Sequence, residues 1–393
     1  MMRRIRKTEI DCSSTALDLA RADLYFEEIR LHHPDDAVRG SYVMPLVTLR
    51  TKACSWSSVS GCTMCGYHLG SAKQQVVGVD DLLTQTRWVI RRLDPNIYHT
   101  LVFTSNGSFL DPDEVPDTVR PELMKMLYEA GFRFVVMESR PGFITPARLD
   151  ALITTVPYGM RKTGKIPFSI SFGIESASDF ILTTCINKGV CVSELADGAA
   201  IIQERSITID GYVLLGKPFL TAQEDCDDAL RTIRWASELG ANYLFVMVTN
   251  RVAGSLANHL IARRHHSLPS LWRAVRLLEM LPASLRRLVQ IKGISHAPYP
   301  PIEYATTCQG CHDRIVRGLN FWNQTGDFAH IQELPFCACR ERFETDEWAN
   351  RPDLSLPCRI HKHYLRLASD LDLNPSIVPP LTMLDMMWQK GQP

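Results

Sequence analysis

The chain has no excess of charge of either sign, since 43 Lys and Arg residues are balanced by 43 Asp and Glu residues. A dedicated nucleic-acid-binding protein usually carries a basic excess, because the neutralisation of phosphates drives its affinity. The balance therefore disfavours a large nucleic-acid-binding surface. It leaves room for a local basic patch, for which the Arg263–His266 segment and the Arg286-Arg287 pair are candidates.

The sequence also has no run of about 18 consecutive apolar residues, so we expect no transmembrane helix. Its basic first residues are followed by the polar Thr8-Glu9-Ile10-Asp11, where a secretory signal would have an apolar segment. We therefore expect a cytoplasmic protein whose thiols stay reduced. At 393 residues the chain is long enough for two domains, or for one large α/β barrel with an appendage.

Short apolar segments alternate with amphipathic ones from about residue 44 to residue 295. The expected strands are 45–49, 100–104, 132–137, 168–172, 207–214 and 243–248, and the expected helices include 79–92, 121–130, 193–204 and 222–239. Near-continuous apolar strands fit a sheet that is buried on both faces, and the alternation predicts right-handed crossovers between parallel strands. Six such units predict an α/β fold with a partial (β/α)6 TIM-like barrel.

The rest of the chain has a different character. Residues 1–43 form an expected N-terminal extension, in which 17–31 has the spacing of a surface helix. Residues 44–295 are the expected barrel. Pro298, Pro300 and Pro301 mark a boundary, after which 296–393 is expected to be a small cysteine-rich, metal-binding region, rich in loops up to about residue 360.

Three of the twelve cysteines follow the first expected strand closely. In a parallel barrel, Cys54, Cys62 and Cys65 would lie at the C-terminal mouth, where active sites are built. A structural zinc ion takes four ligands, which His68 would complete. A [4Fe–4S] cluster held by three cysteines instead leaves one iron open to a substrate or cofactor. The count of three thiols favours the cluster.

A second group of cysteines lies near the C-terminus. Cys308 and Cys311 form one close pair, and Cys337 and Cys339 form another. Two close pairs are typical of a structural Zn²⁺ site, and four thiolates suit a second, auxiliary iron–sulfur cluster equally well. Both alternatives remain open from the sequence. The nearby residues Cys358, His312, His361 and His363 are candidate additional ligands.

The three-cysteine loop after the first barrel strand resembles the radical S-adenosylmethionine (SAM) superfamily. Seven residues separate Cys54 from Cys62, where the superfamily usually has three. Six later segments strengthen the resemblance: 103–116 (FTSNGSFLDPDEVP), 135–141 (VVMESRP), 172–176 (FGIES), 185–189 (CINKG), 211–220 (GYVLLGKPFL) and 269–273 (PSLWR). This ordered series resembles the radical subunit of archaeosine synthase and the related Elongator-like radical enzymes.

The resemblance implies both the cofactors and their contacts. Cys54, Cys62 and Cys65 would hold a [4Fe–4S] cluster, which cleaves SAM reductively to a 5′-deoxyadenosyl radical that abstracts hydrogen from a substrate. Arg140 would pair with the methionyl carboxylate. The remaining implied SAM contacts are Tyr67, the loop Ser105, Asn106, Gly107 and Ser108, then Glu138, Glu175, Ser176 and Lys188.

Several functions remain open. One is cleavage of a carbon–nitrogen bond in a modified nucleoside, together with a partner subunit. Another is radical tailoring of a small metabolite or natural product, and a third is a non-catalytic zinc-binding scaffold. Either enzyme would take electrons from a reductant protein of the flavodoxin or ferredoxin type, and neither would need a membrane.

Overall fold

The computed structural model describes residues 17–30, 41–52, 54–72, 75–163, 166–295, 301–334 and 336–391. Most of the expected N-terminal extension therefore lies outside the described residues, as do Pro298 and Pro300. None of the helices in the described ranges has both the length and the apolar character needed to cross a bilayer.

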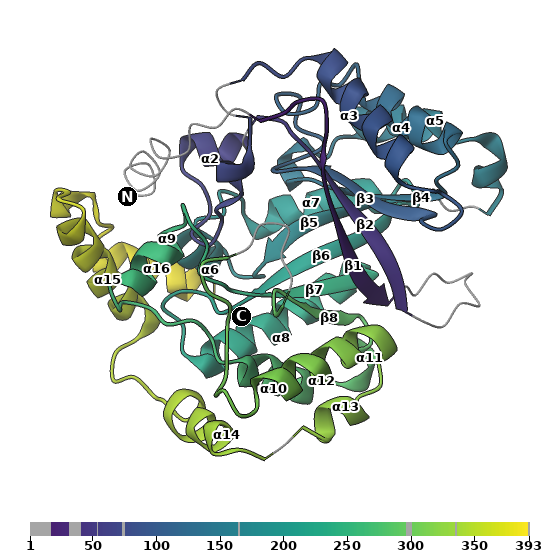
Figure 1. Ribbon diagram of the computed structural model, residues 1–393. Coiled ribbons are helices and arrows are strands. Elements are labelled where there is room, and N and C mark those ends of the chain that lie inside the picture. Colours follow the sequence, from purple (N-terminus) through teal and green to yellow (C-terminus); the bar gives the residue numbers. More distant parts are fainter. Residues whose placement is uncertain are drawn as a thin grey trace.

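Eight strands form one curved sheet in simple chain order (Figure 1). They are β1(Asp23–Arg30), β2(Ser41–Leu49), β3(Thr100–Ser105), β4(Phe134–Glu138), β5(Phe168–Glu175), β6(Thr208–Leu215), β7(Tyr243–Val248) and β8(Val289–Lys292). All neighbouring strands from β2 to β8 are parallel, whereas β1 runs antiparallel to β2. The six expected strands correspond to β2–β7, and the expected α/β partial barrel is confirmed.

The helices expected within the barrel are also present. α3(Val79–Arg92), α4(Arg120–Glu129), α7(Val192–Gln203) and α8(Ala222–Glu238) each lie within one residue of the expected range, and α5(Pro146–Thr155) adds a further one. Each presents an apolar face to the outside of the sheet, as Leu82 and Val89 do in α3. Gly131, which follows α4, has a φ of +105°, a backbone conformation that residues with a side chain rarely adopt.

The sheet contains two strands that the sequence did not predict. Residues 23–30 pair with β2 along their whole length, so the surface helix expected over 17–31 is wrong. Their mixed polar and apolar pattern is compatible with a helical period, but tertiary pairing decides the conformation of such a segment. β8 has only four residues, too few for a period to be recognised.

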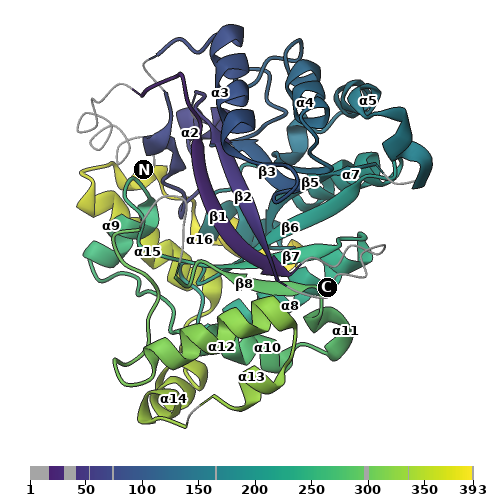
Figure 2. The ribbon, with the colours of Figure 1, turned by 45° about the vertical axis from the view of Figure 1, so that its right-hand side comes forward.

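Side chains bridge β1 and β8, the two edges of the sheet. Gln290 on β8 accepts from the backbone N–H of Arg30 (3.4 Å) and donates to its carbonyl (3.0 Å), as a neighbouring strand would. Lys292 and Glu27 form an ion pair at 3.0 Å across the same junction. α12(His312–Thr325) lies alongside both strands (Figure 2), and the Trp322 carbonyl accepts from Arg30. The partial barrel is thus nearly closed.

The C-terminal region is helical where loops were expected up to residue 360, so that expectation is wrong. It contains α12, α13(Ala329–Gln332), α14(Ala338–Arg342), α15(Leu356–Asp370) and α16(Leu381–Lys390). The buried face of α12 consists of Ile315, Leu319 and Trp322, spaced by four and three residues. That spacing is helical, but the charged and polar residues between them concealed it.

Candidate functional site

The lumen of the partial barrel contains a cavity of about 810 Å³. Every strand contributes to its wall, because alternate residues of a strand point to the same face. Ile29, Met44, Val102 and Val136 form a small apolar cluster of their own within this wall. The polar lining residues come mainly from the strand ends and from β5 and β6.

Cys54, Cys62 and Cys65 all line this cavity. The wide gap between the first two is filled by the short helix α2(Ser55–Val59), which begins directly after Cys54. Trp56 anchors α2, since its Nε1–H donates to the carbonyl of Asn187 at 2.9 Å and its ring packs on Gly189. The unusual spacing is therefore taken up by a docked helical turn, and the three thiols still reach the cavity.

The thiols of Cys54, Cys62 and Cys65 do not form a compact metal-ligand group in the described chain. In the described chain, the C-terminal cysteines form a compact set whose ligand atoms all lie within 4.8 Å of one another. The barrel cysteines and His68 do not belong to such a set. Tetrahedral zinc with 2.3 Å bonds to sulfur would hold its ligands about 3.8 Å apart.

The loop after β3 lies against the cysteine loop. Ser105, Asn106 and Gly107 line the cavity, and Asn106 donates to the Gly70 carbonyl at 3.1 Å. A Cβ at Gly107 would come within 2.7 Å of Cys54 Cα, so only glycine allows this approach. Ser108 does not line the cavity; its hydroxyl instead accepts from the backbone N–H of Arg140.

A carboxyl that the sequence reasoning missed lies beneath this loop. Glu114 accepts from the Ser108 N–H at 2.8 Å and from the Thr51 hydroxyl at 3.1 Å. Burial raises its pKa to about 8. Glu114 lies within the segment 103–116, but nothing in the sequence of this segment distinguishes it from the neighbouring acids Asp111 and Asp113.

Glu175 and Lys188 form a buried ion pair on the cavity wall, at 2.8 Å. Burial lowers the pKa of Lys188, but the Glu175 carboxylate outweighs this effect and the pKa is raised. A bulge in β5 places Glu175 at a φ of +63°, and a Cβ at Gly173 would collide with both charged groups. Bulges and left-handed residues commonly re-aim a side chain at a functional site.

The other predicted contacts divide into residues that line the cavity and a residue that does not. Arg140, Glu138 and Tyr67 line the cavity. Arg140 is held by the carbonyls of Lys188 (2.8 Å) and Gly189 (3.3 Å), and Glu138 accepts from the Tyr212 hydroxyl.

Ser176 does not line the cavity, and neither does Lys217, which follows β6. The Ser176 hydroxyl donates to Asp228 at 2.8 Å. Lys217 is fully buried between Asp225 (3.1 Å) and Asp228 (3.2 Å). These residues form a structural ion-pair cluster between the end of β6 and α8.

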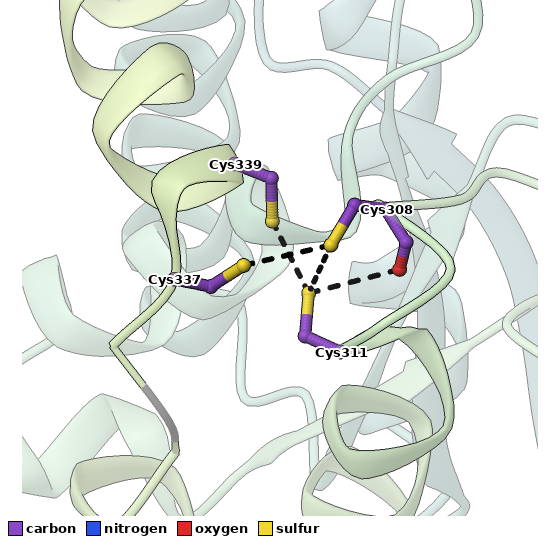
Figure 3. Close-up of side chains that lie close together, drawn as sticks. All are labelled: Cys308, Cys311, Cys337 and Cys339. Carbon is purple, nitrogen blue, oxygen red and sulfur yellow. Dashed lines mark hydrogen bonds between the residues drawn. The ribbon is translucent and has the colours of Figure 1, made fainter.

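The C-terminal cysteines converge on one point, although they come from two helix starts (Figure 3). Cys308 and Cys311 precede α12, whereas Cys337 and Cys339 lie at the start of α14. Their sulfur atoms lie 3.1–3.5 Å apart along the contacts between Cys311 and Cys339, Cys308 and Cys311, and Cys308 and Cys337. Trp272 on α10(Leu271–Met280) donates its indole N–H to Cys339. This group could hold a metal ion, and none of the candidate additional ligands belongs to it.

No protein-family model matches the chain. A protein named archaeosine synthase subunit beta from Methanosarcina acetivorans is 25% identical over 313 residues, covering 78% of this chain and 86% of that protein. Its namesake from Thermococcus kodakarensis is 24% identical over 292 residues, covering 72% of this chain and 85% of that protein. Among solved structures, Elp3 from Methanocaldococcus infernus aligns with a TM-score of 0.46 and 12% identity, over 67% of this chain and 63% of that one. The relatives confirm the resemblance found in the sequence motifs: this chain is a homologue of the proteins named archaeosine synthase subunit beta.

Proposed function

We propose that the protein is a radical SAM enzyme whose active site is the barrel lumen. The supporting observation is that one cavity is lined by Cys54, Cys62 and Cys65, by the Gly107 loop and by the Glu175–Lys188 pair. When bound, the cluster and SAM supply one-electron cleavage of the sulfonium and abstraction of a hydrogen atom.

In this proposal the residues of the chain bind the cluster and SAM and hold them in a fixed orientation. The three thiols hold the cluster, and the backbone beside Gly107 approaches the methionyl ammonium, which its carbonyls accept from. Arg140 pairs with the methionyl carboxylate, because a guanidinium matches a carboxylate in two parallel hydrogen bonds. Glu175 accepts from the ribose hydroxyls, held in position by Lys188 at 2.8 Å. The apolar cluster of the lumen wall excludes water from the reacting atoms.

For the substrate, the homologues favour cleavage of a carbon–nitrogen bond in a modified nucleoside, with a partner subunit. A small free metabolite is the second candidate. It is favoured by a lumen that is nearly closed between β1 and β8 and by a chain of zero net charge. Salt-dependent binding of bulk transfer RNA would support the first candidate, whereas no binding at low salt would support the second.

The C-terminal cysteines hold Zn²⁺ in this proposal. Sulfur–sulfur distances of 3.1–3.5 Å are close to the roughly 3.8 Å that tetrahedral zinc requires and leave no space for a cube of iron and sulfide between them. The indole N–H of Trp272 supports one ligand from outside, as is usual at metal sites.

Anaerobic reconstitution tests the active site. The protein would be loaded with iron and sulfide, reduced, supplied with SAM and assayed for 5′-deoxyadenosine. Replacing Cys54, Cys62 or Cys65 with Ala should abolish both product and the visible absorption of the cluster. Cys358→Ala removes a thiol from α15, outside the cavity, and should change neither. Cleavage of SAM by the triple variant would show that the ligand assignment is wrong.

Metal analysis tests the second site separately. We expect one zinc per chain that survives in the triple barrel variant, and a loss of that zinc and of folded yield in Cys308→Ser. Iron above four per chain in the parent protein, with about four irons per chain still bound in the triple barrel variant, would show that an auxiliary cluster occupies this site instead.

A further inference from the structure

A row of polar side chains crosses the lumen on neighbouring strands. In the register of the sheet, Glu138 on β4 pairs with Ser171 on β5, Ser171 pairs with Asp210 on β6, and Asp210 pairs with Tyr243 on β7. All four side chains line the cavity. Of these, only Glu138 belongs to the predicted cofactor contacts, and the proposed function gives no role to the others.

Two of these side chains have hydrogen-bonding atoms that make no well-formed hydrogen bond in the described chain. The Oδ1 atom of Asp210 and the hydroxyl of Ser171 make no hydrogen bond of ordinary geometry there, although the residues are only 4% and 0% exposed. Burial raises the pKa of Asp210 to about 7, and the nearby hydroxyls of Ser169 and Ser171 offset part of that rise. Buried polar groups in native proteins are nearly always hydrogen-bonded, so a ligand that donates to them would remove a real cost.

The charges of the lumen are unevenly distributed. Among the described residues of its wall, Lys292 is paired with Glu27, and Lys188 is paired with Glu175. Arg140 is held by backbone carbonyls beside the cysteine loop. The remaining carboxyls are Glu138, whose partner is the neutral Tyr212 hydroxyl, and Asp210. The β4–β6 side of the lumen is therefore acidic, and no cation of the described chain neutralises it.

Aromatic rings form the wall beside these carboxyls. Tyr212 and Phe245 lie 5.5 Å apart between ring centres with planes 33° apart, and Tyr243 and Phe245 lie 6.3 Å apart and nearly parallel. All three line the cavity. Such surfaces favour flat groups, and they favour cations as well.

We propose that the lumen contains a substrate subsite, which we call the Asp210 subsite, and that it binds a flat nitrogen-containing group. This group presents N–H donors and positive charge to Asp210. The subsite consists of Ser171, Asp210, Tyr212, Tyr243 and Phe245. The group stacks on the aromatic wall while Asp210 Oδ1 and the Ser171 hydroxyl accept from it. The assignment as a substrate subsite rests on the proposed function, but the binding preference does not.

Three small ligands of nearly equal shape test the preference: benzamidine, which is cationic, benzamide, which is neutral, and benzoate, which is anionic. Their dissociation constants would be measured by ligand-observed NMR on the full chain at pH 8, where Asp210 is mostly ionised. We expect benzamidine to bind about tenfold or more tightly than benzoate. Asp210→Asn should weaken benzamidine binding about ten- to a hundredfold, the range for a hydrogen bond to a charged group, and should affect benzamide little.

Two serines of β5 provide a matched control. Ser169 and Ser171 are both fully buried and both have a hydroxyl that makes no hydrogen bond of ordinary geometry in the described chain, but only Ser171 lines the cavity. Ser171→Ala should weaken benzamidine binding more than Ser169→Ala does, because only Ser171 lines the cavity beside the bound group. If the row is merely structural, both variants would change stability alike and neither would change binding.

The outcomes separate this inference from the proposed function. Equal binding of the three ligands, a preference for benzoate, or a preference that survives in both Asp210→Asn and Ser171→Ala would overturn the subsite. If the subsite is overturned but the reconstituted protein cleaves SAM, the proposed function is still supported. Conversely, a benzamidine preference lost in Asp210→Asn would support the subsite's binding chemistry even if no cluster could be assembled.

Discussion

Gly107→Ala is the most direct perturbation of the contact between the cysteine loop and the loop after β3. A Cβ at this position would lie 2.7 Å from Cα and Cβ of Cys54 and 2.1 Å from Oε1 of Glu114. The Cys54 backbone belongs to the turn that starts α2, and Glu114 is held by buried hydrogen bonds from Ser108 and Thr51, so neither can move without losing hydrogen bonds.

The expected cost combines two effects. Overpacking of a filled site costs roughly 1–3 kcal/mol, and an unsatisfied buried polar group costs a further 1–3 kcal/mol or so. We therefore expect the free energy of unfolding to fall by about 3–4 kcal/mol in denaturant titrations. Since the relaxation displaces Cys54, iron incorporation on reconstitution should fall as well.

Gly142→Ala is the matched control. No atom lies within 4 Å of the Cβ it would add, so its stability should stay within about 0.5 kcal/mol of the parent. The reasoning is refuted if Gly107→Ala unfolds at the same denaturant midpoint as Gly142→Ala and takes up the same amount of iron.

Two further predictions concern buried charge. Burial raises the pKa of Asp210 from 3.8 to about 7. Between about pH 4 and pH 7 the folded chain therefore keeps a proton on Asp210 that the unfolded chain releases. As a consequence, the free energy of unfolding falls as the pH rises through this range. Asp210→Asn should lack this fall and be more stable than the parent at pH 8, by at most about 4 kcal/mol; parallel pH profiles in urea titrations would contradict this. Lys217→Met leaves Asp225 and Asp228 without their common cation and should cost about 3–5 kcal/mol of unfolding free energy. A loss below about 1 kcal/mol in the same assay would show that Arg273, which also pairs with Asp225, suffices alone.

The site could be predicted only in part. The cysteine loop, the Gly107 loop and the ends of β4 and β5 stand out because each is a short, continuous segment with an unusual composition. Ser108 and Ser176 belong to the same segments, yet their side chains point into the protein. A sequence segment shows which residues are near one another along the chain, but the facing of each side chain depends on how its strand ends, as the bulge before Glu175 illustrates.

The sequence by itself determined the parallel barrel strands, the helices between them, and the two groups of cysteines, because apolar periods and cysteine spacings are local properties of the chain. Only the tertiary structure decided that residues 23–30 form a strand, that none of the candidate additional ligands joins the four C-terminal cysteines, and that Ser171 and Asp210 meet in an acidic, aromatic-walled lumen. The physical reason is that register and closure arise from pairing between segments far apart in the chain. A lone acid within an apolar strand has no local pattern to reveal which side chains will lie beside it.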